Sequence, residues 1–188
     1  MKSMEVKRGV SVNPDPKAAI SQLHKAIKCT EEQYNIIFCS SNYNLETLGR
    51  EIKSTFGKNV FCCTTSGELS TSGYTKNSIV GASISSKRMK FHKYVVPNVD
   101  EFNAEYVNKM YSDFLNKTSE SKIKNAKYLG LVIIDGLSMK EDNIIALLSK
   151  TFENVDIVGG SSGDDLKFSS THIYNDGVFQ NNSAEFLI

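Results

Sequence analysis

Two short stretches rich in glycine, serine and acidic residues have the residue types that bind small molecules. The first is residues 65–68, with the sequence Thr-Ser-Gly-Glu, and the second is residues 159–165, with the sequence Gly-Gly-Ser-Ser-Gly-Asp-Asp. Glycine lets backbone amides turn sharply and approach a ligand closely, because it has no Cβ atom. Serine hydroxyls and carboxylates add short hydrogen-bonding groups. Both stretches follow apolar runs that are typical of strands, so we predict two loops that lie at strand ends.

Other polar residues are expected at the same edge of the sheet. Ser40 and Ser41 end one apolar run, and Asp135 and Gly136 end another. In α/β proteins, ligands bind at the carboxyl ends of the strands, where loops and helix N-termini converge. We therefore predict a single ligand site that consists of the two loops and these strand ends. The predicted site residues are Ser40, Ser41, Thr65, Ser66, Gly67, Glu68, Asp135, Gly136, Gly160, Ser161, Ser162, Gly163, Asp164 and Asp165.

The chemistry of these residues favours a small polar ligand held between the two loops. Glycine amides would face its anionic groups and a carboxylate would face an ammonium group, with Asp135 beneath the ligand. An amino acid carries both charges and fits better than a nucleotide, whose phosphates would call for lysine or arginine in the loops. We therefore expect a small-molecule-binding protein without catalytic activity, cofactor or metal.

Two enzymatic alternatives depend on the second loop. Residues 159–163 match the G-x-S-x-G pattern of a serine hydrolase, which needs a helix directly afterwards and a histidine later in the chain. No helical period follows, and the one later histidine is His172, so the sequence argues against this class. A metal-dependent hydrolase that uses Asp135, Asp164 and Asp165 stays open, because carboxylates at strand ends suit Mg²⁺. A third alternative is a protein-interaction scaffold in which the glycine loops are structural turns.

Composition and charge exclude several classes of protein. The chain has 188 residues, 23% of them charged, and its formal net charge of +1 gives no basic patch for nucleic acid. No apolar run approaches the length of a membrane span, and the first residues lack the core of a signal peptide. The four cysteines fall mostly in strand-like runs without metal-ligand spacing, which predicts buried thiols in a reducing compartment. We therefore expect a cytoplasmic protein.

Strand-like runs alternate with helical periodicity along the chain, which predicts an α/β fold. Asp15 is expected to cap the first helix, and Asp100 the third. Ser138 and Glu141 fit a capping box at the start of the fourth helix, because their side chains can bind each other's backbone amides.

The order of these elements repeats along the chain. Residues 6–85 and residues 90–188 each give strand, helix, strand, helix, strand, glycine loop and further strands. This order predicts a duplicated strand-helix-strand-helix-strand-hairpin unit with pseudo-twofold symmetry, in which mixed sheets are covered by helices. Strands over residues 78–85 and 90–96 are expected to be joined by a tight turn at residues 86–88.

Five stretches of the chain have a characteristic order and spacing, namely residues 9–19, 65–69 with 73–74, 135–138, 158–168 and 174–177. In these stretches the sequence resembles the N-terminal FIST domain, and the resemblance covers nearly its whole length. At residues 62–64 the chain has Cys-Cys-Thr where the family pattern favours a glycine-rich turn, so the first loop is expected to be less open here.

This resemblance implies a cytoplasmic sensory module of signal-transduction proteins. Such modules are usually coupled to kinase, chemotaxis or cyclic-nucleotide output domains, and small ligands such as amino acids have been proposed for them. No catalytic residues carry over, because the family has no established reaction. The resemblance also implies that residues 1–188 form one sensory domain and that the protein continues into a C-terminal partner domain.

Overall fold

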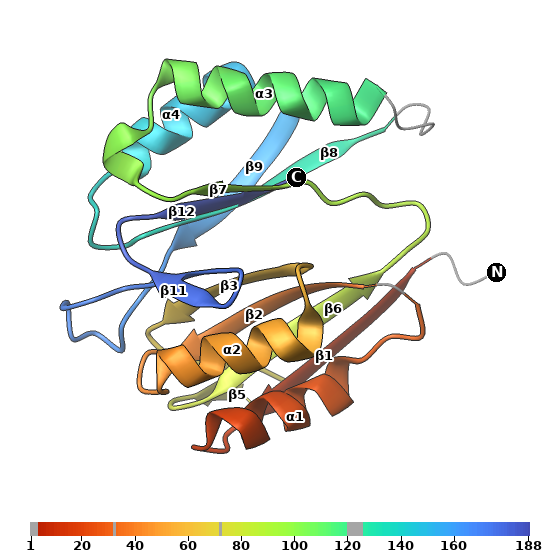
Figure 1. The fold of residues 1–188 in the computed structure, drawn as a ribbon, viewed down its shortest axis with the longest axis vertical. Coiled ribbons are helices and arrows are strands. Elements are labelled where there is room, and N and C mark those ends of the chain that lie inside the picture. The colour runs from red at the N-terminus through yellow and green to blue at the C-terminus, as the bar shows by residue number, and fades with distance from the viewer. Residues whose placement is uncertain (1–3, 32, 72, 120–125) are drawn as a thin grey trace.

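The computed structural model describes residues 4–31, 33–71, 73–119 and 126–188. Two sheets lie against each other in the middle of the molecule, and a pair of helices covers the outer face of each sheet (Figure 1). The predicted α/β class, with mixed sheets covered by helices, is confirmed. The helices of the described ranges are α1 (Pro16–Ile27), α2 (Leu45–Phe56), α3 (Ala104–Ser119) and α4 (Glu141–Thr151), with a 3₁₀ turn η1 (Val99–Glu101) before α3.

The larger sheet has the strand order β1-β6-β2-β3-β10-β11. β2 and β3 are parallel, and the other neighbouring strands are antiparallel. Helices α1 and α2 pack on its outer face. Its strands are β1 (Glu5–Ser11), β2 (Tyr34–Ser40), β3 (Val60–Thr65), β6 (Ile79–Ser85), β10 (Ile173–Asn175) and β11 (Val178–Gln180).

The smaller sheet has the strand order β7-β12-β8-β9. β8 and β9 are parallel, and β12 is antiparallel to both β7 and β8. A separate hairpin follows β3. The strands of the smaller sheet are β7 (Lys93–Val96), β8 (Tyr128–Ile134), β9 (Val155–Ser161) and β12 (Ala184–Leu187), and those of the hairpin are β4 (Glu68–Ser70) and β5 (Gly73–Thr75).

The two sheets share one topology over four of their strands. The order β1-β6-β2-β3 in the larger sheet matches β7-β12-β8-β9 in the smaller one, with the same parallel and antiparallel neighbours. Each half also has a hairpin. The hairpin β4-β5 lies between β3 and β6 in the chain, and the hairpin β10-β11 lies between β9 and β12. The second hairpin joins the sheet of the first half, next to β3. The duplication itself, with superposition of residues 6–85 on 90–188 by a pseudo-twofold axis, is not confirmed and stays a prediction.

Local sequence signals explain where the first two helices begin and end. The Asp15 side chain accepts a hydrogen bond of 2.8 Å from the Ala18 amide, so the predicted cap of α1 is confirmed. Asn44 caps α2 in the same way, with 2.8 Å between its side-chain oxygen and the Thr47 amide. At the end of α2, Gly57 takes a positive φ of 68°, which is a conformation that favours glycine.

The predicted caps of the last two helices are wrong. Asp100 lies in η1, and α3 begins later, where the Asn103 side chain accepts a hydrogen bond from the Tyr106 amide at 3.0 Å. α4 begins at Glu141 without a side-chain cap. The Ser138 hydroxyl donates instead to the Asp135 carbonyl oxygen at 2.7 Å, so it closes the turn after β8 rather than the helix.

The predicted tight turn at residues 86–88 is also wrong, because β6 and β7 belong to different sheets. The segment between them crosses from the larger sheet to the smaller one. Apolar spacing indicates both strands correctly, but it does not say which strand each one pairs with. The crossing segment is tied down by His92, whose amide and carbonyl groups bond those of Ile188 at 2.7 and 2.9 Å.

Apolar side chains form three clusters, one beneath each helix pair and one between the sheets. The cluster between the sheets is the smallest of the three, and its buried members are Tyr34, Phe61, Cys63, Ile133, Ile173 and Leu187. All four cysteines are buried and free, as the sequence predicts. Within the described ranges, no helix combines the length and the apolar character that crossing a membrane requires.

Candidate functional site

Asp135, predicted to lie beneath a ligand, connects three segments of the chain. It follows β8 and is almost fully buried. Its carboxylate accepts hydrogen bonds from the Leu137 amide at 2.9 Å, from the Thr171 hydroxyl and from the Asn182 amide. Each of these donors comes from a different turn, so the carboxylate holds the ends of β8, β10 and β12 together. Its hydrogen-bonding capacity is used inside the protein.

Asp164 organises the loop that follows the second glycine stretch. Its carboxylate accepts hydrogen bonds from the amides of Phe168, Ser169 and Ser170 at 2.7 to 3.0 Å. Burial alone would raise the pKa of Asp164, but these three amides outweigh that effect and lower the pKa to about 2. The loop therefore presents Phe168 to solvent in a left-handed conformation, with a φ of 53°.

Asp165 joins the two halves of the molecule at the predicted site. Its carboxylate accepts hydrogen bonds from the Ser40 hydroxyl at 2.8 Å and the Ser41 hydroxyl at 3.1 Å. Its amide donates to the Thr65 carbonyl oxygen at 3.2 Å. The structure thus brings Ser40, Ser41, Thr65 and Asp165 together, as the sequence predicts for these strand ends.

Glu68 lies next to this group. It is buried, and its two carboxylate oxygens accept hydrogen bonds from the hydroxyls of Thr65 and Ser78. Burial raises the pKa of Glu68, the two hydroxyls lower it in part, and the nearby Asp165 carboxylate raises it further. The Glu68 side chain therefore stabilises the turn after β3 through these two hydrogen bonds.

The two glycine loops touch each other directly. The Gly163 amide donates to the Thr64 carbonyl oxygen at 2.9 Å, and a Cβ atom at Gly163 would lie 2.4 Å from the Ser66 hydroxyl oxygen. Gly67 takes a φ of 114°, so it makes the turn that a residue with a side chain would strain. The loops therefore form a joint between the halves of the molecule. A ligand between them would have to displace these hydrogen bonds.

The remaining site residues lie at the edge of the smaller sheet or beneath it. Gly160 is exposed, with open space where a Cβ atom would stand. Ser162 is buried, and Gly136 packs so closely on its carbonyl oxygen that a Cβ atom would lie 2.3 Å away. The Ser161 hydroxyl donates to Glu141 at 2.8 Å. The chain after Gly160-Ser161 does not form the helix that a nucleophile elbow requires.

The carboxylates of the metal-dependent alternative are separately engaged. Asp135, Asp164 and Asp165 each bind their own set of amides or hydroxyls, as described above. Within residues 4–31, 33–71, 73–119 and 126–188, no group of three or more histidine, cysteine or acidic side chains is placed to hold a metal ion.

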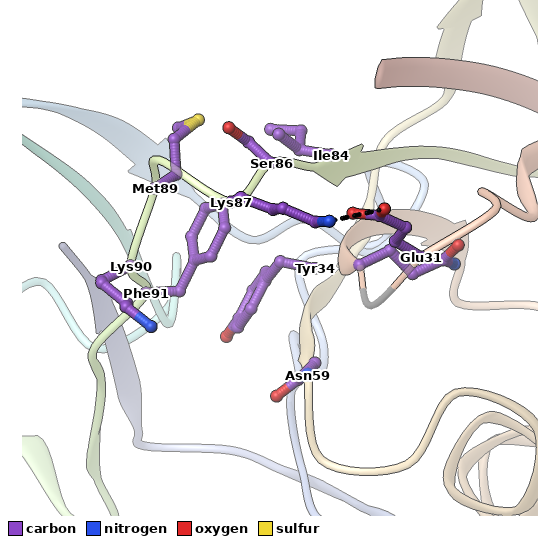
Figure 2. Close-up of a pocket in the computed structure, with 10 residues that line it drawn as sticks. Glu31, Tyr34, Asn59, Ile84, Ser86, Lys87, Met89, Lys90 and Phe91 are labelled. Carbon is purple, nitrogen blue, oxygen red and sulfur yellow. Dashed lines mark ion pairs between the residues drawn. The ribbon is translucent and has the colours of Figure 1, made fainter. Parts of the chain in front are cut away.

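A cavity of about 460 Å³ opens where the chain crosses between the sheets (Figure 2). Its walls come from β2, from the end of β6 and from the segment that leads to β7. Phe91 stacks on Tyr34, with 4.7 Å between ring centroids and 22° between ring planes. Ile84 and Met89 add apolar surface, and Asn59 adds a polar side chain. The volume falls in the range of small-molecule pockets.

The Tyr34 hydroxyl is the most unusual group of this cavity. It is buried, and it has no hydrogen-bond partner among the residues that the structure describes. An unpartnered buried hydroxyl costs free energy, and a bound water molecule or ligand group that paired with it would remove this cost. Burial raises the pKa of Tyr34, and the nearby Glu185 carboxylate raises it further, so this hydroxyl keeps its proton and can donate it.

The rim of the cavity carries charges of both signs. Lys87 Nζ lies 3.1 Å from a Glu31 carboxylate oxygen. Lys90 makes no ion pair or side-chain hydrogen bond within the described ranges. In Figure 2 the ammonium end of Lys90 and the hydroxyl end of Tyr34 point toward the same space. The arrangement offers an ammonium and a hydroxyl donor to an anion, and a carboxylate to a cation.

Sequence reasoning missed this cavity. Tyr34, Asn59 and Phe91 lie far apart in the chain, and none belongs to a recognisable motif. The available signal was Lys87-Arg88, a basic pair that falls in a segment predicted to be a turn. The mistaken hairpin concealed it, since a tight turn between paired strands leaves no cavity beneath it.

Comparison with protein families identifies a match over most of the chain. A model of the FIST N domain matches residues 33–188, which is most of the chain and includes both glycine loops and the residues that line the cavity, except Glu31. A search of the curated proteins found no match. The chain therefore belongs to the FIST N domain family, a family of sensory domains in signal-transduction proteins.

Proposed function

We propose that this domain senses a small polar metabolite, with an amino acid as the favoured class, in the cavity beneath the crossing segment. The observation that carries the proposal is Tyr34, a residue of the cavity wall whose buried hydroxyl lacks a partner among the described residues. A hydrogen bond from a ligand would satisfy this group, and the cost of leaving it unpaired would be recovered on binding.

The charges of the rim support an amino acid as ligand. Its carboxylate would bind Lys90 and the Tyr34 hydroxyl, and its ammonium group would bind the Glu31 carboxylate. The ligand's side chain would then pack on Phe91 and Met89, which lie in the same wall. Hydrogen bonds in which one partner is charged contribute about 1.5–3 kcal/mol each.

The position of the cavity supports a role in signalling. The segment at residues 86–91 is both a wall of the cavity and one of the connections between the two sheets. It leads into His92, which bonds to Ile188 directly after β12. A ligand that fixes this segment would therefore bias how the smaller sheet sits on the larger one. We propose that an output domain or protein of the kinase, chemotaxis or cyclic-nucleotide type reads this change.

The two glycine loops have a different role in this proposal. Their amides, hydroxyls and carboxylates bind one another across the halves, so we propose that they fix the joint about which the halves move. The alternative, a ligand between the loops, predicts a different set of sensitive residues, which the experiment below includes.

The test is a thermal-shift screen of the common amino acids, followed by calorimetric titration of those that bind. At one hundred times its Kd, a ligand should stabilise the domain by about 2.7 kcal/mol. Tyr34→Phe and Lys90→Gln should each weaken binding about tenfold or more, because each removes a hydrogen bond to the ligand carboxylate. Tyr43→Phe and Lys109→Gln are matched controls away from the cavity, and they should leave the affinity unchanged.

Two results would overturn this proposal. One is that no common amino acid stabilises the domain. The other is that a bound amino acid has the same affinity for wild type, Tyr34→Phe and Lys90→Gln. Loss of binding in Asp165→Asn, with full binding in Tyr34→Phe, would place the ligand at the glycine loops.

A further inference from the structure

A second hollow, of about 430 Å³, lies on the inner face of the larger sheet. It shares no lining residue with the cavity beneath the crossing segment. Ile36 and Phe38 of β2 and Val80 and Ala82 of β6 form its floor. These side chains point away from α1 and α2, because the alternate residues of the same strands pack against those helices.

The hollow exists because the smaller sheet covers only part of the larger one. Contacts between the sheets involve β2, β3 and β10, through residues such as Phe61, Cys63 and Ile173. The inner face of β1 stays open, and Val6 on it is 51% exposed. The β4-β5 hairpin reaches over the open part, where β4 contacts both β2 and β6 and brings Leu69 to the hollow. Sheet and hairpin thus enclose a space of small-molecule size.

One charged side chain lines this apolar space. Arg8 of β1 is exposed, and within the described ranges its guanidinium makes neither a hydrogen bond nor an ion pair. Surface arginines commonly pair with carboxylates, and a guanidinium can bind both oxygens of one carboxylate at once. An unpaired guanidinium beside apolar side chains is complementary to a molecule with an apolar body and a single anionic end.

We propose that this hollow binds a small amphiphilic carboxylate, such as a medium-chain fatty acid. Its apolar body lies on Ile36, Phe38 and Val80 beneath the β4-β5 hairpin, and its carboxylate binds Arg8. This site shares no lining residue with the amino-acid cavity, so each proposal can be tested independently of the other.

The test is calorimetric titration of the domain with octanoate, 1-octanol and acetate. Octanoate has both the apolar body and the charge, octanol lacks the charge and acetate lacks the body. We expect octanoate to bind, octanol to bind at least tenfold more weakly, and acetate not to bind. Arg8→Gln should weaken octanoate binding at least tenfold and remove the preference over octanol.

Three variants keep this test specific. Arg50→Gln removes the same charge from α2, where the arginine pairs with Glu46, and should bind octanoate as wild type does. Tyr34→Phe should also bind octanoate normally, because it alters only the other cavity. Leu69→Ser should weaken octanoate and octanol alike, since Leu69 is 78% exposed and can be replaced without disturbing the core.

Absence of octanoate binding in the millimolar range would overturn the proposal, and would favour a protein surface as the occupant of the hollow. Equal binding of octanoate and octanol, unchanged in Arg8→Gln, would also overturn it.

Discussion

At the scale of single residues, Tyr34 and Tyr43 are two buried tyrosines whose hydroxyl groups differ in their hydrogen bonding. The Tyr43 hydroxyl donates to the Asn13 carbonyl oxygen at 2.9 Å, whereas the Tyr34 hydroxyl lacks a partner among the described residues. Both rings are nearly fully buried, so their packing is comparable. The two hydroxyls therefore differ in their hydrogen bonding.

Removing each hydroxyl should therefore have different effects on stability. Tyr34→Phe should leave the free energy of unfolding unchanged or raise it by up to about 1 kcal/mol, because it removes an unsatisfied polar group. Tyr43→Phe should lower it by about 1 kcal/mol, the worth of an ordinary hydrogen bond. Urea unfolding measures both values. Equal destabilisation of the two variants would show that Tyr34 has a partner within the protein.

At the residue scale, the sequence predicted which polar residues lie close together better than it predicted what those residues do. It placed Ser40, Ser41, Thr65 and Asp165 at one edge of the sheets, and the structure brings them together. From the polarity of these residues, the sequence analysis predicted that they bind a ligand. Only the three-dimensional structure shows that these groups bind one another, because the donor and the acceptor of each pair come from segments far apart in the chain.

At the scale of elements, the contact between the two glycine loops depends on Gly163. Its φ does not lie in the left-handed region that favours glycine, so space alone requires glycine there. A Cβ atom would lie 2.4 Å from the Ser66 hydroxyl oxygen and 2.8 Å from the Ser66 backbone nitrogen. Gly160, three residues earlier, has nothing within 4 Å of the same position.

The same substitution at these two glycines should therefore have different effects. Gly163→Ala should lower the free energy of unfolding by about 1–3 kcal/mol, the usual cost of overpacking, because the Ser66 backbone must move. Gly160→Ala should stay within about 0.5 kcal/mol of wild type, as a surface substitution without new contacts. Denaturant unfolding of both variants is the measurement. If Gly163→Ala were as stable as Gly160→Ala, the loops would not form a rigid joint.

Elements were predicted well from sequence, and their pairing was not. Apolar periodicity located the helices and most of the strands, and Asp15 marked the start of α1 correctly. The strands at residues 78–85 and 90–96 were also placed nearly correctly, yet they belong to different sheets. A strand's residues say which of its faces is apolar, whereas its neighbours depend on the whole chain.

At the scale of the whole molecule, a buried ion pair lies between the two sheets. Glu185 of β12 is fully buried, and one of its carboxylate oxygens lies 3.1 Å from Lys93 Nζ. Lys93 also donates to the Val60 carbonyl oxygen of the larger sheet at 3.1 Å. Burial raises the pKa of Glu185 to about 8, although Lys93 opposes this effect.

This raised pKa makes the stability of the molecule depend on pH in a defined direction. The folded state holds the Glu185 proton more tightly than the unfolded state, so stability should fall as pH rises from about 4.5 to about 8. Glu185→Gln removes this contribution, so its stability relative to wild type should rise across the same window. Glu46→Gln, on the exposed surface of α2, is the control and should show no such trend. Parallel pH profiles for wild type and Glu185→Gln would contradict the expectation.

Hydrogen–deuterium exchange, with and without a mixture of the common amino acids, tests the central claim most directly. The cavity is bounded by the crossing segment, so the account predicts slower amide exchange in residues 84–92 when the amino acids are present. It predicts no change in residues 65–68 and 159–165, and weaker protection of residues 84–92 in Tyr34→Phe than in wild type. Protection confined to the two glycine loops, or equal protection in wild type and Tyr34→Phe, would contradict the account.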